Sequence, residues 1–137
     1  MTNLFIGLIL ALLATLSFSD PLGRHLVGSY EIVEGTYEEL LGYTFANDKR
    51  IYFNFPWLLQ SMRESGGVQN TYAVGACVLV HEAVHLRTAA QFPHGDEELP
   101  MLYQYVCLDR LGASVESKQN VYNAIQKMAV ERYRCCQ

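Results

Sequence analysis

One long segment in the middle of the chain constrains the fold more than any other feature. From Tyr72 to Val80 the sequence is apolar on every face of a helix, and it continues into "HEAVHLR". A helix that is apolar all round has to be buried. Asn70 or Thr71 can cap it, and it should end near Gln91, because Pro93 forbids its continuation. The remaining segments must therefore be arranged around this helix.

Shorter segments on both sides of this helix have strand and helix patterns. We expect strands at residues 29–35, 43–45 and 50–55, one or two helical turns at 36–42, a short helix at 56–65 and helices at about 98–111 and 115–133. The predicted fold class is α+β, with a small mixed sheet of about three strands packed on the long helix and two further helices beside it.

Length and composition indicate one globular domain. The chain has 137 residues, of which 50% are hydrophobic and 18% charged, enough for a modest core. The sequence contains no internal repeat and no interdomain linker. Its net charge of −4 and its scattered Lys and Arg exclude the basic stripe on which nucleic-acid binding usually depends.

The N-terminal segment is apolar. Residues 1–19 carry no charged side chain, and the apolar run at 4–18 stops at Asp20-Pro21. This length fits the core of a signal peptide and is short for a membrane span. We expect residues 1–19 to be a cleaved export signal and residues 20–137 to be a secreted or periplasmic domain. The alternatives are an uncleaved anchor, giving membrane association through residues 4–18, and a buried N-terminal helix.

Four cysteines follow this segment, namely Cys77, Cys107, Cys135 and Cys136. In an exported protein an even number of cysteines suggests disulfides, and four of them allow three connectivities. The sequence has no C-x-x-C pair, which argues against a cysteine-type zinc knuckle or a redox motif of that kind.

The long helix contains the residues with the clearest chemistry. His81 and His85 are four residues apart, so they share one helix face and can point both imidazoles at one metal ion. Glu82 lies about 100° round the helix from His81, close to a water on that metal. This is the H-E-x-x-H arrangement, and neutral imidazoles suit zinc. The alternative is that this is a buried helix with a purely structural role. That interpretation has to account for three ionisable groups on an otherwise apolar segment.

This arrangement predicts a zinc-dependent hydrolase acting on a peptide or protein substrate. Zinc lowers the pKa of its bound water to about 7. Glu82 then acts as the general base when water attacks the carbonyl, and it passes the proton to the leaving amine. The alternative function is an exported, non-catalytic binding module with a structural or vestigial metal site.

The motif also supports a family resemblance. "HEAVH" resembles the active-site helix of the zincin metallopeptidases, and "NDKRIYFNFPWL" is similar to the strand that precedes that helix and forms the edge above the cleft. The resemblance covers residues 43–112, and the H-E-x-x-H motif is its specific part. The signal-like start together with the motif is also similar to small bacterial proteins.

The resemblance implies a third protein ligand. Thr88 and Gln91 stand where the metzincin subclass has glycine and histidine, so that subclass does not fit. A gluzincin-like site takes a glutamate from the next helix, which favours Glu98, with Glu97 as the alternative ligand. Less favoured candidates are His94, Asp96 and Glu116. Peptide deformylases also carry H-E-x-x-H, but their cysteine ligand lies far upstream, whereas Cys77 is one turn before the motif.

Three further expectations follow from the resemblance. If His85 and Glu98 meet on antiparallel helices, equal rise per residue brings Cys77 and Cys107 to the same height, where they can form a disulfide. A stabiliser of the oxyanion could come from Tyr103, Tyr105 or His94. Asp109 is a candidate carboxylate behind the metal ligands.

Overall fold

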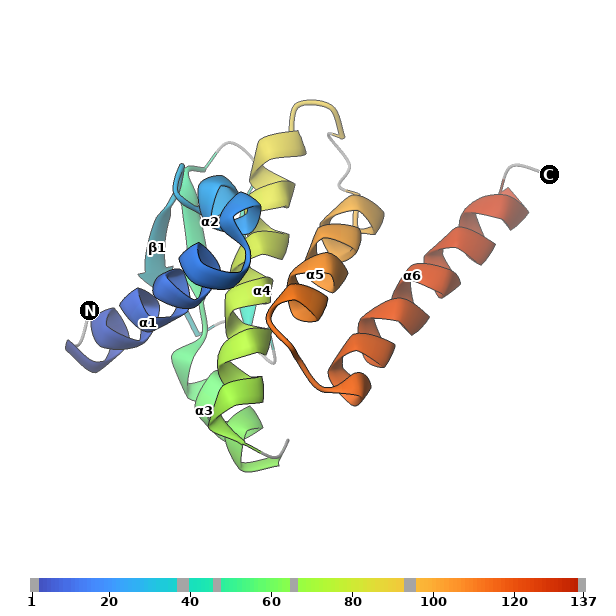
Figure 1. Ribbon diagram of the computed structural model, residues 1–137. Helices are drawn as coiled ribbons and strands as arrows, with labels where there is room; N and C mark the ends of the chain where they lie inside the picture. Colours follow the sequence, from blue (N-terminus) through green and yellow to red (C-terminus); the bar gives the residue numbers. More distant parts are fainter. Residues whose placement is uncertain (1–2, 37–39, 46–47, 65–66, 93–95, 136–137) are drawn as a thin grey trace.

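The computed structural model describes residues 3–36, 40–45, 48–64, 67–92 and 96–135, with the side chains of 61–64, 133 and 135 left aside (Figure 1). Within these ranges the chain forms six helices and one mixed sheet of three strands, which confirms the predicted α+β class. The helices are α1 (Asn3–Ser19), α2 (Pro21–Val27), α3 (Phe55–Glu64), α4 (Val68–Thr88), α5 (Glu98–Arg110) and α6 (Val115–Cys135). The strands are β1 (Glu31–Glu34), β2 (Gly42–Tyr43) and β3 (Arg50–Phe53).

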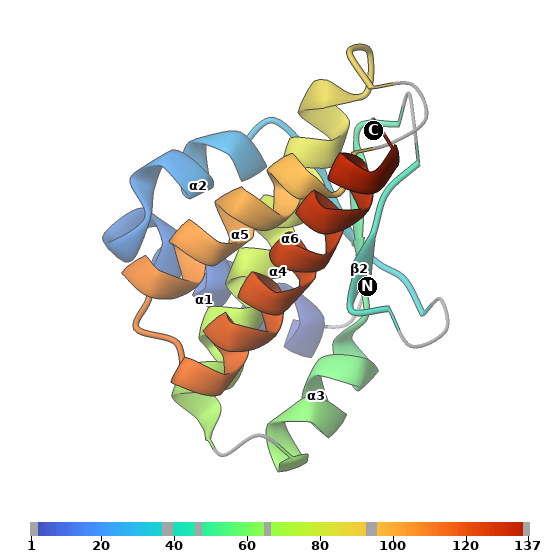
Figure 2. The same ribbon diagram turned by 90° about the vertical axis from the view of Figure 1, so that its right-hand side faces the viewer.

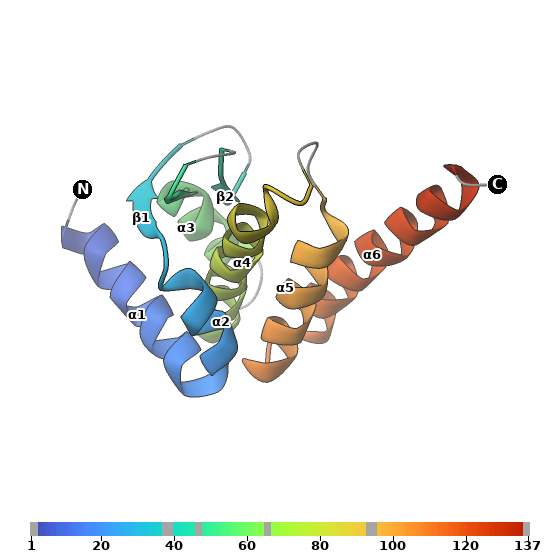
Figure 3. The ribbon, with the colours of Figure 1, turned by 90° about the horizontal axis from the view of Figure 1, so that it is seen from above.

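Helix α4 is the centre of the molecule, as its apolar sequence predicts. The sheet, α1 and α2 lie on one side of it, and α5 followed by α6 lies on the other (Figures 1 and 3). Leu79, Val80 and Ala83 are fully buried. The helix begins slightly earlier than predicted, after Gly67, whose φ of 132° is a conformation that favours glycine. The Thr71 hydroxyl donates a hydrogen bond of 2.9 Å to the carbonyl of Gly67.

The sheet has the order β1-β3-β2 and lies beside α4 (Figure 2). Strand β1 is parallel to β3, and the edge strand β2 is antiparallel to it. Ile51 and Phe53 alternate along β3 and are fully buried, because the side chains of alternate strand residues face the same layer. Of the predicted helical turns at 36–42, residues 37–39 lie outside the described residues, and Gly42 belongs to β2.

The apolar N-terminal segment forms helix α1, which packs against α4 and α2. One side of the helix belongs to the hydrophobic core, namely Phe5, Ile9, Leu12 and Leu16. This is the least favoured of the three expectations for the segment, and cleavage of residues 1–19 stays a prediction. Among the described residues, none of the helices combines the length and the hydropathy of a membrane span.

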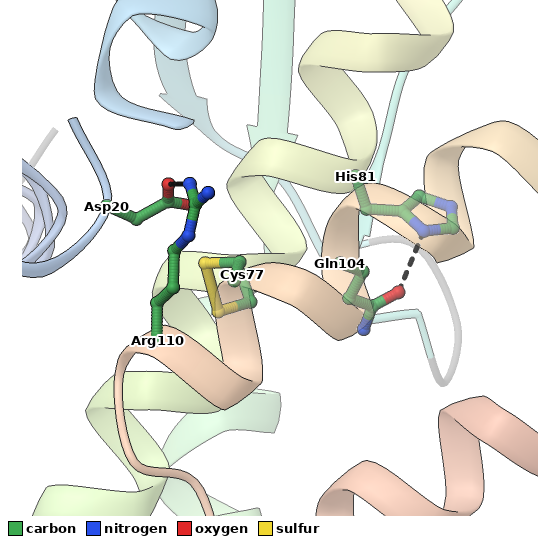
Figure 4. Close-up of a disulfide and its surroundings, with 6 residues drawn as sticks. Asp20, Cys77, His81, Gln104 and Arg110 are labelled. Atoms are coloured by element: carbon green, nitrogen blue, oxygen red, sulfur yellow. Dashed lines mark hydrogen bonds and ion pairs between the residues drawn. A yellow bond between two sulfur atoms is a disulfide. The ribbon is translucent and has the colours of Figure 1, made fainter. Parts of the chain in front are cut away.

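Helix α5 lies against α4 and is joined to it by a disulfide. Cys77 and Cys107 form this bond, with a Cα–Cα distance of 5.5 Å, so the predicted pairing is confirmed. On one side of the disulfide, the buried carboxylate of Asp20 accepts a hydrogen bond of 2.7 Å from Arg110 (Figure 4). Helix α6 packs on the outer side of α5 (Figure 2). Cys136 and the side chain of Cys135 are outside the described part of the structure.

Candidate metal centre

Three side chains from two elements converge at the end of α4. His81 and His85 lie one turn apart on this helix, and Glu97 directly precedes α5. Glu97 Oε1 is 2.8 Å from His85 Nε2, and its Oε2 is 3.1 Å from His81 Nε2. The two Nε2 atoms are 3.1 Å apart. This triad of His81, His85 and Glu97 could hold a metal ion.

Hydrogen bonds to the two histidines favour the ionised form of Glu97 and outweigh the opposite effect of burial on its pKa. The side chains of His81 and His85 are only 11% and 18% exposed, whereas that of Glu97 is 53% exposed. Hydrogen bonds from His81 and His85 lower the pKa of Glu97 well below its usual range. In return, the hydrogen bond to Glu97 raises the pKa of His85. Glu97 is therefore an ionised carboxylate before any cation binds, which is the form that a metal requires.

The donor set and its spacing fit zinc. A tetrahedral zinc ion with bonds of roughly 2.0–2.1 Å places its ligand atoms roughly 3.3 Å apart. The two Nε2 atoms are 3.1 Å apart and lie 2.8 and 3.1 Å from different oxygens of Glu97, so the three residues are close enough to share one ion. Two imidazole nitrogens and a carboxylate oxygen are ordinary zinc ligands, and a set of three leaves one tetrahedral position for water or substrate.

Glu82 lies beside the triad without being part of it. Its Oε1 is 3.9 Å from His81 Nε2, and its side chain is 9% exposed. Burial raises the pKa of Glu82, while His81 and His85 act in the opposite direction. The side chain of Thr44, just after β2, also forms a hydrogen bond with this carboxylate, which favours the charged form. Glu82 is thus a poorly solvated carboxylate held at a fixed place near the triad.

The triad and Glu82 share one cavity of about 420 Å³. Its polar side contains the three triad residues, Glu82, Thr44 and Gln104. Its apolar side comes from the segment around β2 and from helices α4 and α5. The residues are Leu40, Leu41, Tyr43, Val78 and Met101. This volume lies within the usual range for small-ligand sites, roughly 300–1,000 Å³.

The structure brings together the three motif residues and the alternative third candidate, Glu97. Glu98, which the sequence favours, lies elsewhere, and its carboxylate accepts a hydrogen bond from Arg132 of α6. Asp96 caps α5 instead, since its carboxylate accepts hydrogen bonds from the backbone N–H groups of Glu98 and Leu99 at 3.2 and 3.3 Å. Consecutive residues at a helix start point in different directions, so of the three acidic residues at 96–98 Glu97 is the one that contacts the histidines.

The other predicted site residues have partners away from the triad. Asp109 pairs with Lys118 at 3.3 Å, in an exposed position. Tyr103 lines a separate cavity with Asp20 and Arg110. The ring of Tyr105 lies against that of Tyr122, with centroids 6.2 Å apart. The less favoured Glu116 lies in the first turn of α6 and is exposed. His94 is outside the described residues.

Sequence reasoning missed two residues of the site. Gln104 Oε1 lies 2.8 Å from His81 Nδ1, and Thr44 contacts Glu82. Gln104 follows Glu97 by seven residues, or about two turns, so both lie on the face of α5 directed at α4. That spacing could have indicated Gln104, whereas no local signal points to Thr44.

Comparisons with protein-family models, with curated proteins and with solved structures found no match to this chain.

Proposed function

We propose that the protein is a zinc-dependent hydrolase that cleaves peptide bonds. One observation supports this most: a buried carboxylate, Glu82, lies beside a His-His-Glu triad and shares its cavity without belonging to the triad. A catalytic zinc site combines three protein ligands with a separate base close to the metal-bound water. The zincin resemblance of the "HEAVH" segment agrees with this assignment.

In this proposal the triad residues hold the metal and Glu82 transfers the proton. His81 and His85, each through Nε2, and Glu97 would hold zinc, which when bound lowers the pKa of water to about 7 and polarises the substrate carbonyl. Glu82 takes the proton of the attacking water and then donates it to the leaving amine. Burial raises the pKa of Glu82, which strengthens this carboxylate as a proton acceptor.

A second candidate is an exported binding module with a structural metal. A structural zinc site usually has four protein ligands, whereas three residues converge within the part of the chain that the structure describes. The hydrolase is therefore the better supported proposal. Because disulfides persist in oxidising compartments, the Cys77–Cys107 bond also supports a secreted or periplasmic protein.

Metal analysis and peptide hydrolysis test this proposal together. We expect purified wild type to bind one zinc ion and to cleave members of a mixed peptide library. His81→Ala should lose stoichiometric zinc, while the matched change at an exposed histidine, His25→Ala, should keep it. Zinc retained in full by His81→Ala would refute the metal site.

The second arm of this experiment isolates the base. Glu82→Gln should keep zinc but lose hydrolysis by at least about 100-fold, the lower end of the usual contribution from a general base. Glu131→Gln, an exposed change on α6, should leave both unchanged. Full hydrolysis by Glu82→Gln would refute the mechanism. Zinc binding by wild type without hydrolysis of any library peptide would favour the binding module.

A further inference from the structure

The two ring nitrogens of His81 face different partners. Nε2 faces Glu97 and His85, within the triad. Nδ1 faces away from the triad and lies 2.8 Å from Oε1 of Gln104 on α5 (Figure 4). The carboxamide of Gln104 therefore contacts the ring nitrogen of His81 that the triad does not use.

This contact favours one tautomer of His81 in the metal-bound site. A neutral imidazole carries one proton, and the nitrogen that binds a metal must be the unprotonated one. The amide oxygen of Gln104 can only accept a hydrogen bond, so Nδ1–H has to be the donor. When the neutral ring binds a metal, the lone pair of His81 is therefore on Nε2 and points toward Glu97 and His85. Without a metal, Nε2 faces the carboxylate of Glu97, which can accept a hydrogen bond from it.

The fold holds Gln104 at this position from both sides. Cys107 follows Gln104 by one turn on α5, and Cys77 precedes His81 by one turn on α4. The disulfide between them joins the two helices one helical turn away from the His81–Gln104 contact (Figure 4). At the other end, Glu97 contacts both histidines. Gln104 thus lies on α5 between the Cys77–Cys107 disulfide and the contacts of Glu97 with the histidines, and both of these join α5 to α4.

We propose that Gln104 is a positioning residue, which fixes the tautomer and the ring orientation of His81 so that Nε2 binds zinc. This inference rests on the metal site proposed above, and it assigns to Gln104 a role that the H-E-x-x-H motif does not contain. Partners of this kind behind a metal ligand commonly change metal affinity by about 10–100-fold when they are removed. Because an amide is neutral, Gln104 orients His81 without adding a third negative charge to Glu82 and Glu97.

Two substitutions of similar size separate the hydrogen bond from packing. Gln104→Glu keeps an oxygen that accepts from Nδ1–H, whereas Gln104→Leu fills comparable space and cannot accept. We expect Gln104→Leu to bind zinc about 10–100-fold more weakly than wild type and Gln104→Glu to restore the affinity. Gln119→Leu, a matched change on the exposed side of α6, should have no effect. Competition with a chromophoric chelator measures each zinc affinity.

The hydrogen bond itself gives a second readout that packing alone would not change. NMR of the zinc-loaded protein should show the Nδ1–H proton of His81 shifted downfield and protected from exchange with water in wild type and in Gln104→Glu. In Gln104→Leu this proton should lose the downfield shift and exchange faster. The wild-type spectrum needs no variant, so this test stands even if Gln104→Leu does not fold.

The outcomes distinguish this inference from the proposed function. A His81 Nδ1–H proton that exchanges freely with water in zinc-loaded wild type would overturn the role of Gln104, and so would a Gln104→Leu protein with wild-type zinc affinity. Absence of zinc binding by wild type would instead refute the metal site from which the role is inferred. Hydrolysis is not used as a readout, so the identity of the substrate does not affect the result.

Discussion

At the scale of single residues, Glu97 and Glu98 are neighbours in the sequence but have different partners. Glu97 contacts both motif histidines, and Glu98 pairs with Arg132. Successive residues of a helix point about 100° apart, so one of two adjacent glutamates can face α4 while the other faces α6. The sequence identifies this pair of candidates, and the packing of α5 between two helices distinguishes them.

This difference gives a prediction for the third ligand. Glu97→Gln should weaken zinc binding by at least about 100-fold, more than the usual loss of a partner behind a ligand. Glu98→Gln should change the zinc affinity by less than about threefold and serves as the matched control. Equilibrium dialysis of both variants against zinc measures the effect. A larger loss in Glu98→Gln than in Glu97→Gln would exclude Glu97 as the ligand.

At the scale of secondary-structure elements, α1 shows how far an apolar pattern can be interpreted. All the faces of this helix are apolar, so the sequence alone fits an export signal, an anchor or a core helix. In the structure one face is buried, while Leu10 on another face is 62% exposed. Strand β3 and α4 were more predictable. The alternation of β3 fits a strand with one buried face, and the apolar run of α4 lies in the middle of the chain, where an N-terminal export signal is not an alternative.

Paired leucine substitutions test whether α1 belongs to the folded core. Leu12 is fully buried, so Leu12→Ala should lower the free energy of unfolding by about 2–5 kcal/mol. Leu10→Ala removes the same atoms from an exposed position and should change it by less than about 0.5 kcal/mol. Urea denaturation of the full-length chain measures both. Equal stabilities of the two variants would show that α1 does not pack as described.

At the scale of the whole molecule, the site depends on how α4 and α5 face each other. Three contacts along their length join these helices: Glu97 with the histidines, Gln104 with His81, and Cys107 with Cys77. Of these three, the contact between the cysteines is covalent. It keeps the two helices at a fixed separation when no metal is bound, which preorganises the triad for a cation.

Removal of this covalent link should affect both stability and metal binding. The disulfide joins residues 30 positions apart, so in the chain-entropy view Cys77→Ala combined with Cys107→Ala should lower the free energy of unfolding by about 3–4 kcal/mol. Zinc affinity of the folded double variant should also fall, because α4 and α5 are less constrained. Denaturation and zinc titration under oxidising conditions measure these effects. A reductant should destabilise wild type and leave the double variant unchanged.

An unchanged double variant would contradict this account of the disulfide. If stability falls while the zinc affinity stays at the wild-type value, the contacts of Glu97 with the histidines and of Gln104 with His81 are sufficient to hold the triad. The stability and affinity readouts therefore test separately whether the disulfide supports the fold and whether it supports the metal site.

The sequence by itself determined the local features of this protein. Spacing within one helix places His81 and His85 on the same face with Glu82 beside them, and hydrophobic periodicity predicts α4 and β3. Only the tertiary structure decided that Glu97 joins the histidines, that Gln104 contacts His81 and that α1 packs into the core. The physical reason is that helical periodicity fixes neighbours within an element, whereas contacts between elements depend on how their faces pack.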